Sequence, residues 1–90
     1  MSVRRTIYFS GDVQGVGFRY TAAGVARAFD VVGTVRNLSD GRVEIVAEGD
    51  PAEIDRFVGA IHDEMAGLVR DTEATESPAT GQWTGFHIVH

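Results

Sequence analysis

A glycine-rich loop followed by an arginine is the part of this sequence best suited to chemistry. Gly11, Gly15 and Gly17 precede Arg19, which stands at the start of a segment with helical spacing of apolar residues. Glycines accept positive φ and let backbone N–H groups converge on a ligand, and a helix N-terminus adds unpaired donors. The planar guanidinium of arginine matches the geometry of a phosphate. The segment therefore predicts an anion site and suggests chemistry on a phosphate group.

The residues around this loop predict alternating strands and helices. Apolar residues recur at helical spacing from Phe18 to Phe29 and from Ile54 to Met65, and Asp50-Pro51 is a typical helix start. β-branched or alternating runs predict strands over residues 3–11, 31–38, 42–48, 68–75 and 85–90. The order β-α-β-β-α-β with a short terminal strand predicts a ferredoxin-like α+β fold, with two helices on one face of an antiparallel sheet.

This order of elements brings a distant asparagine to the glycine loop. A right-handed β-α-β crossover makes the first two strands run in the same direction, and the third strand returns between them. The ends of the first two strands then fall on the same edge of the sheet. We therefore expect Asn37, near the end of the second strand, to lie beside Arg19.

The composition limits the class of protein. Residues 1–90 are enough for one domain. The chain has no cysteine, which excludes disulfides, thiolate metal sites and a cysteine nucleophile. Its net charge of −5 argues against a nucleic-acid-binding surface. The apolar run Ile7-Tyr8-Phe9 is too short for a signal peptide or a membrane span, so we expect a cytoplasmic protein without membrane contact.

A long, ordered motif in this chain resembles the acylphosphatase family. It comprises Val13-Gln14-Gly15-Val16-Gly17-Phe18-Arg19 and then Gly33-x-Val35-Arg36-Asn37-x-x-Asp40-Gly41-x-Val43-Glu44. The length, the order of elements and the terminal Gly85-Phe86-His87-Ile88 also fit, so the likeness covers the whole chain. The resemblance implies hydrolysis of acyl phosphates, such as acetyl phosphate, to a carboxylate and inorganic phosphate, with no metal and no cofactor.

The resemblance also implies roles for individual residues. Arg19 and Asn37 would be catalytic, Arg19 by holding the phosphoryl group and Asn37 by positioning the attacking water. The other phosphate-binding residues, acting through backbone N–H groups, would be Gln14, Gly15, Val16, Gly17 and Phe18. Physical chemistry agrees, because a carboxylate leaves readily and the barrier falls mainly through positioning and charge stabilisation. We expect a small-molecule acyl phosphate as substrate and a monomeric protein.

Three positions depart from the family pattern. Asp30, at the end of the first predicted helix, and Thr34, in the second predicted strand, would affect only turns and packing. Asp12, by contrast, places a carboxylate next to the glycine loop. Two interpretations of Asp12 remain open: it repels the substrate, or its side chain points away from the loop. The side chain of Gln14 also has two interpretations, a contact with the ligand or a tie within the protein.

The sequence is also compatible with two functions other than catalysis. A catalytically idle anion-binding or interaction domain of the same fold is the main alternative, and a nucleic-acid-binding domain is the weaker one. The histidines at positions 62, 87 and 90 are expected to be structural or solvated rather than metal ligands. Glu44 and Glu48 alternate with apolar residues, which predicts a solvated sheet face.

Overall fold

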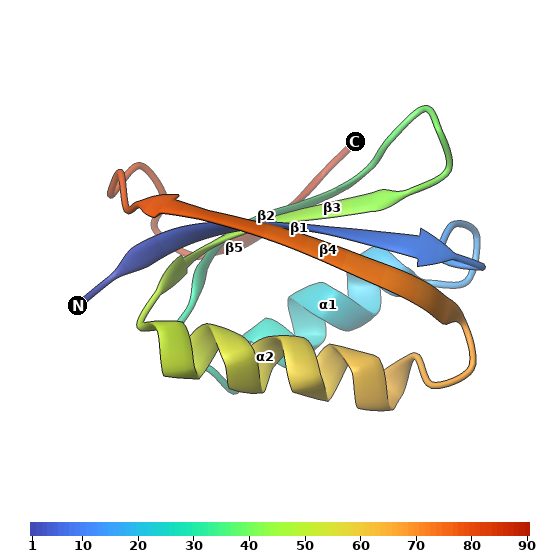
Figure 1. The fold of residues 1–90 in the computed structure, drawn as a ribbon, viewed down its shortest axis with the longest axis horizontal. Helices are drawn as coiled ribbons and strands as arrows, with labels where there is room; N and C mark the ends of the chain where they lie inside the picture. The colour runs from blue at the N-terminus through green and yellow to red at the C-terminus, as the bar shows by residue number, and fades with distance from the viewer.

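The computed structural model describes residues 1–90 as a five-stranded sheet and two helices (Figure 1). The predicted order of elements is confirmed. The elements are β1 (Val3–Gly11), α1 (Phe18–Ala26), β2 (Val32–Asn37), β3 (Val43–Gly49), α2 (Pro51–Glu64), β4 (Val69–Pro78) and β5 (Phe86–Val89). No helix is long and apolar enough to cross a membrane.

The strands lie in the order β4-β1-β3-β2-β5. As expected, β3 lies between β1 and β2 and is antiparallel to both, so the last residues of β1 and β2 share one edge of the sheet. The sequence left the direction of the terminal strand open, and β5 pairs with β2 in parallel, from Gly33↔Phe86 to Arg36↔Val89. The loop after β4 reverses the chain and carries it to the far edge of the sheet. The strand that follows must therefore run with β2, and the sheet is mixed.

Both helices cover the same face of the sheet (Figure 1), and the hydrophobic core lies between the helices and the sheet. α1 contributes Phe18, Ala22 and Ala26 to this core, and α2 contributes Ile54, Phe57 and Ile61. The predicted start of α2 is confirmed, since the Asp50 side chain accepts a hydrogen bond from the Ala52 N–H at 3.0 Å.

The strand β2 contains a glycine that its contact with β3 requires. Gly33 has φ +146°, and a Cβ added there would collide with the carbonyl oxygen of Val46 on β3. The neighbouring atom is backbone, so it cannot move aside as the end of a side chain would. Gly33 therefore allows the close pairing that places Asn37 at the end of β2.

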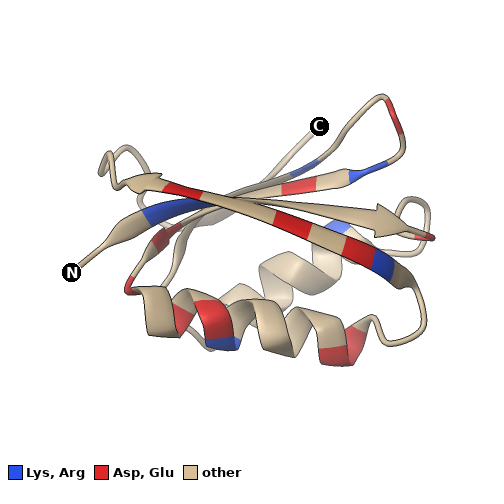
Figure 2. Cartoon of the chain, in the orientation of Figure 1, with Lys and Arg blue, Asp and Glu red and all other residues tan.

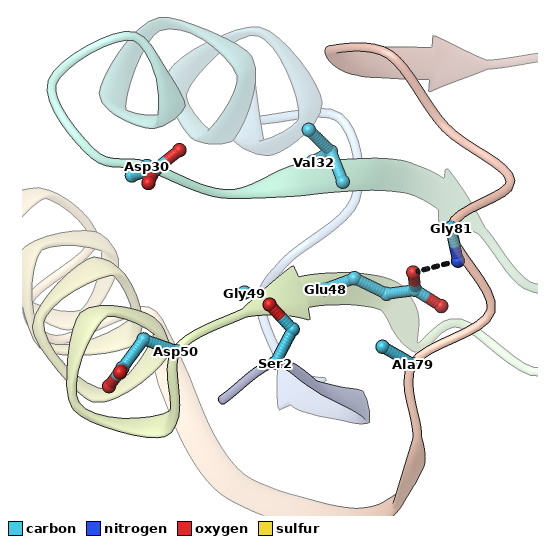
Figure 3. Close-up of a pocket in the computed structure, with 8 residues that line it drawn as sticks. All are labelled: Ser2, Asp30, Val32, Glu48, Gly49, Asp50, Ala79 and Gly81. Atoms are coloured by element: carbon cyan, nitrogen blue, oxygen red, sulfur yellow. Dashed lines mark hydrogen bonds between the residues drawn. The ribbon is translucent and has the colours of Figure 1, made fainter.

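The prediction that Glu48 lies on a solvated face is wrong. Its side chain is only 4% exposed, because the segment between β4 and β5 folds over it. One carboxylate oxygen accepts hydrogen bonds from the Thr80 N–H (2.8 Å) and hydroxyl (2.7 Å), and the other accepts from the Gly81 N–H (2.9 Å). Figure 3 shows Glu48 and Gly81 in this contact, beside a cavity of about 300 Å³. The Glu44 side chain is 12% exposed and pairs at 2.8 Å with Arg36, whose side chain is 51% exposed.

These contacts shift the ionisation of Glu48. Burial alone would raise its pKa, but the hydrogen bonds from Thr80 and Gly81, with the positive charge of Arg4, outweigh burial and hold the pKa below its ordinary value. A carboxyl whose folded pKa is lowered stabilises the fold fully above its ordinary pKa of about 4.5. That stabilisation is lost as the pH falls through the lower pKa of the folded state.

We expect Glu48→Ala to lower the free energy of unfolding at pH 7 by about 2 kcal/mol, because hydrogen bonds to a charged group are lost. Denaturant unfolding at pH 7 and at pH 3 measures this, and the deficit should shrink at pH 3. Glu44→Ala is the matched control, since its ion pair is partly solvated and should contribute less than about 1 kcal/mol. Equal losses for the two variants at pH 7 would contradict the role assigned to Glu48.

Candidate active site

The loop between β1 and α1 is anchored in the core at both of its ends. Val13 is 1% exposed and Phe18 is 2% exposed. The Phe18 ring packs against Phe9 of β1, with ring centroids 4.9 Å apart. Between the two anchors, Gly15 and Gly17 adopt left-handed backbone conformations with φ +77° and +79°. The anchors hold the loop in place, and the glycines let it turn sharply between them.

The backbone N–H groups of this loop are free to bind a ligand. None of the N–H groups from Gln14 to Tyr20 donates a hydrogen bond to an acceptor in the protein, and the first N–H of α1 that does so belongs to Thr21. Gly17 is the residue that caps the N-terminus of α1, and the first turn of this helix carries no acidic residue. Free donors and the positive end of a helix dipole together favour an anion.

The side chain of Gln14 ties the loop to the hairpin between β2 and β3. Its amide nitrogen donates to the carbonyl oxygens of Leu38 (2.8 Å) and Arg42 (2.9 Å). Those two residues are themselves paired across the hairpin, because the Leu38 N–H donates to the Arg42 carbonyl at 2.8 Å. Of the two interpretations of this side chain, the structure therefore shows the tie within the protein.

Arg19 and Asn37 lie on the same cleft. This cleft has a volume of about 220 Å³ and is lined by Val13, Gly15, Gly17, Phe18, Arg19, Tyr20 and Asn37. The two polar residues reach it from α1 and from the end of β2, as the strand order predicted. Gln14 and Val16 do not line the cleft, since the Gln14 side chain turns to the hairpin and Val16 is exposed on the loop.

The guanidinium of Arg19 has only weak contacts within the protein. One of its nitrogens lies 3.4 Å from the carbonyl oxygen of Val89 and 3.4 Å from Nδ1 of His90. Both distances are long for hydrogen bonds, so they leave the side chain free to turn toward a ligand. The sequence did not predict these contacts, because they depend on the parallel pairing of β5 with β2.

Positive charge dominates the cleft. Among the residues that line it, Arg19 is the one with a charged side chain. Figure 2 shows acidic residues on α2 and β4, whereas α1 has no acidic residue. Asp12 is exposed, does not line the cleft and forms no ion pair or side-chain hydrogen bond. Its position favours the interpretation in which the carboxylate points away from the loop.

The fold and the cleft define a ferredoxin-like protein with a glycine-rich loop of unpaired N–H groups at the start of its first helix. The profile of the acylphosphatase family matches residues 5–88. This chain therefore belongs to the acylphosphatase family.

Individual relatives agree with this assignment. An acylphosphatase of Paenarthrobacter aurescens is 44% identical over 89 residues, which cover 98% of this chain and 95% of that protein. The crystal structure of acylphosphatase from Bacillus subtilis has a TM-score of 0.89 at 38% identity, covering 98% of this chain and 99% of that one. Full-length HypF, solved in a phosphate- and nucleotide-bound form, matches with a TM-score of 0.88 at 28% identity, but over only 12% of its own chain.

We expect Gln14→Ala to weaken inhibition by inorganic phosphate by about tenfold, because two hydrogen bonds that hold the loop to the hairpin are lost. Inhibition constants for phosphate, measured with acetyl phosphate as substrate, test this. Gln14→Glu is the matched variant: it keeps the shape of the side chain but cannot donate to the two carbonyls. Wild-type inhibition in Gln14→Glu would show that the tie is not needed.

Proposed function

We propose that Arg19 and the backbone N–H groups of residues 14–18 hold the phosphoryl group of an acyl phosphate, and that Asn37 positions the water that attacks it. The activity itself follows from the family: the chain is an enzyme that hydrolyses acyl phosphates to a carboxylate and inorganic phosphate. The observation that supports these roles is the cleft, which Arg19 and Asn37 line together with loop residues whose N–H groups have no partner in the protein.

The chemistry needs little beyond positioning and charge. The leaving group is a carboxylate, which departs without protonation at neutral pH. The phosphoryl group passes through a loose transition state with negative charge on its oxygens. The unpaired N–H groups of the loop and the Arg19 guanidinium are hydrogen-bond donors that would stabilise that charge.

Asn37 is suited to position the attacking water because its amide is neutral and has no partner in the protein. Its side chain forms no hydrogen bond within the protein and lies on the same cleft as Arg19. A carboxylate in its place would repel the phosphate, whereas an amide oxygen accepts a hydrogen bond from water without adding charge. No carboxylate or histidine lines the cleft. We therefore propose that the phosphate itself accepts the proton of the water.

We further propose that the reaction needs no metal ion and that the protein acts as a monomer in the cytoplasm. The positive charge that a metal would supply is available from Arg19 and the helix N-terminus. A chain without cysteine is compatible with a reducing compartment.

The second candidate is an idle domain that binds an anion without turnover. The similarity to a small part of HypF shows that this fold also occurs within a larger protein. The presence of both Arg19 and Asn37 on one cleft favours the enzyme, because anion binding alone would not require a neutral amide beside the arginine.

We expect Arg19→Ala to lower kcat/KM for acetyl phosphate at least a hundredfold, since one charge-assisted contact to the transition state is lost. Arg19→Lys should restore little, because a point charge does not replace the planar fork. Release of phosphate is measured with and without a chelator, and wild-type turnover should be unaffected by chelation. Arg27→Ala, at an exposed arginine just after α1, is the matched control. Activity of Arg19→Ala within threefold of wild type would exclude the proposed role.

We expect Asn37→Ala to lower kcat at least tenfold with a smaller change in KM, because the interaction lost is with the attacking water rather than with the phosphate. Asn37→Asp should be no more active, since its carboxylate lies beside an anion. Steady-state kinetics with acetyl phosphate separate kcat from KM. A rise in KM alone would identify Asn37 as a binding residue only.

A further inference from the structure

The hairpin between β2 and β3 follows Asn37 directly but has no place in the hydrophobic core. It extends beyond the sheet at the ends of these two strands (Figure 1). Asn37 and residues 39–41 are exposed. No residue from 37 to 42 belongs to the core, and Leu38, the one apolar residue among them, does not pack against it. Contacts other than apolar packing must therefore hold the hairpin in position.

Arg42 makes several of these contacts. Within the hairpin, its carbonyl oxygen accepts a hydrogen bond from the Leu38 N–H at 2.8 Å. Its own N–H and Nε donate to the two carboxylate oxygens of Asp40 at 3.0 and 2.8 Å. Outside the hairpin, its guanidinium carbon lies 4.5 Å from the centre of the Tyr8 ring on β1, a distance at which a cation over an aromatic ring is stabilising. Arg42 therefore joins the hairpin to the sheet.

The register of the sheet explains why the arginine meets this ring. Tyr8 pairs with Glu44 across β1 and β3, and Arg42 precedes Glu44 by two residues, so its side chain lies on the same face of the sheet. Diagonal neighbours of this kind are within reach of long and aromatic side chains. Ile7 and Phe9, on either side of Tyr8 in β1, are buried in the core. The ring therefore stands on a firmly held strand and gives the hairpin a fixed support.

We propose that Arg42 is a positioning residue for the reaction, because its contact with Tyr8 holds the hairpin that follows Asn37. This inference rests on the proposed role of Asn37. Arg42 does not line the cleft, so it acts through the hairpin and does not touch the substrate. Asn37 pairs with Val43, the residue next to Arg42, so a displacement of Arg42 is passed on to Asn37. The contact thus keeps the spacing between Asn37 and Arg19 constant.

The test measures kcat for acetyl phosphate and the inhibition constant of inorganic phosphate in Arg42→Ala. We expect kcat to fall about threefold to tenfold, because a small error in the placement of a reacting group is costly. Phosphate inhibition should stay within about twofold of wild type, since the interaction lost concerns the water. The glycine loop keeps its anchors in the core, and Gln14 binds the Arg42 carbonyl, which the substitution leaves in place.

Two substitutions of Tyr8 repeat the test from the other side of the contact. Tyr8→Leu should lower kcat as Arg42→Ala does, whereas Tyr8→Phe keeps the ring and should keep the wild-type kcat. Thermal unfolding shows which variants are folded at the assay temperature, and Tyr8→Leu carries the test if Arg42→Ala is not. The matched control is Arg4→Ala, which removes a guanidinium 5.2 Å from the Trp83 ring near the other end of β1 and should leave kcat unchanged.

A double variant decides whether Arg42 acts through Asn37. In an Asn37→Ala background, Arg42→Ala should lower kcat no further, because the amide that it positions is already absent. Equal losses from Arg42→Ala with and without Asn37 would show a merely structural role and overturn this inference. So would a wild-type kcat in Arg42→Ala, and both results would leave the proposed function standing. A wild-type kcat in Asn37→Ala would instead overturn the proposed role of Asn37, and this inference with it.

Discussion

Burial of two side chains on either side of a short loop is the constraint on which the site depends. Val13 and Phe18 are both inserted in the core, so the residues between them must span a fixed gap outside it. Gly15 and Gly17 meet this requirement with left-handed conformations, which cost other residues about 1–2 kcal/mol each. A Cβ at either glycine would meet no neighbouring atom, so the requirement is conformational and not steric. Core packing thus shapes the loop before any polar side chain contributes.

The second requirement is that the loop and the end of β2 keep a fixed spacing. Two connections provide it. The pairing of β3 with both β1 and β2 sets the distance between the strand ends, and Gly33 permits the close contact of β2 with β3. Gln14 then ties the loop directly to the hairpin that follows Asn37. The sheet and the Gln14 amide therefore hold together the three segments around the cleft: the loop before α1, the end of β2 and the hairpin between β2 and β3.

Much of this could be predicted from the sequence, because it depends on local patterns and on a general rule of handedness. The helical spacing, the Asp50-Pro51 helix start and the right-handed crossover were sufficient to predict the element order and the meeting of Arg19 with Asn37 on one cleft. The remainder depends on contacts between distant segments. Glu48 is buried by a loop 32 residues further along the chain. The alternation of residues within its own strand could not predict that contact.

The pairing of β5 was missed for a related reason. Its four residues alternate as any short edge strand does, and nothing in that pattern specifies which edge they join or in which direction. The contact of Arg19 with the Val89 carbonyl follows from that pairing and could not be predicted without it. Side chains whose role depends on tertiary contacts, such as Gln14, were likewise left with two interpretations that only the structure could separate.

A protein with a net charge of −5 is expected to repel an anionic substrate, yet enzymes of this family act on acyl phosphates. The distribution of charge resolves this. At physiological ionic strength, exposed charges more than about 8 Å apart are largely screened from each other. The acidic residues of α2 and β4 lie on elements that do not line the cleft (Figure 2), so they contribute less than nearby groups do. The cleft itself is lined by Arg19, and it lies beside unpaired N–H groups at the N-terminus of a helix that has no other charged residue. The local field is therefore positive, and the acidic composition of the rest of the chain is compatible with a phosphate-binding enzyme.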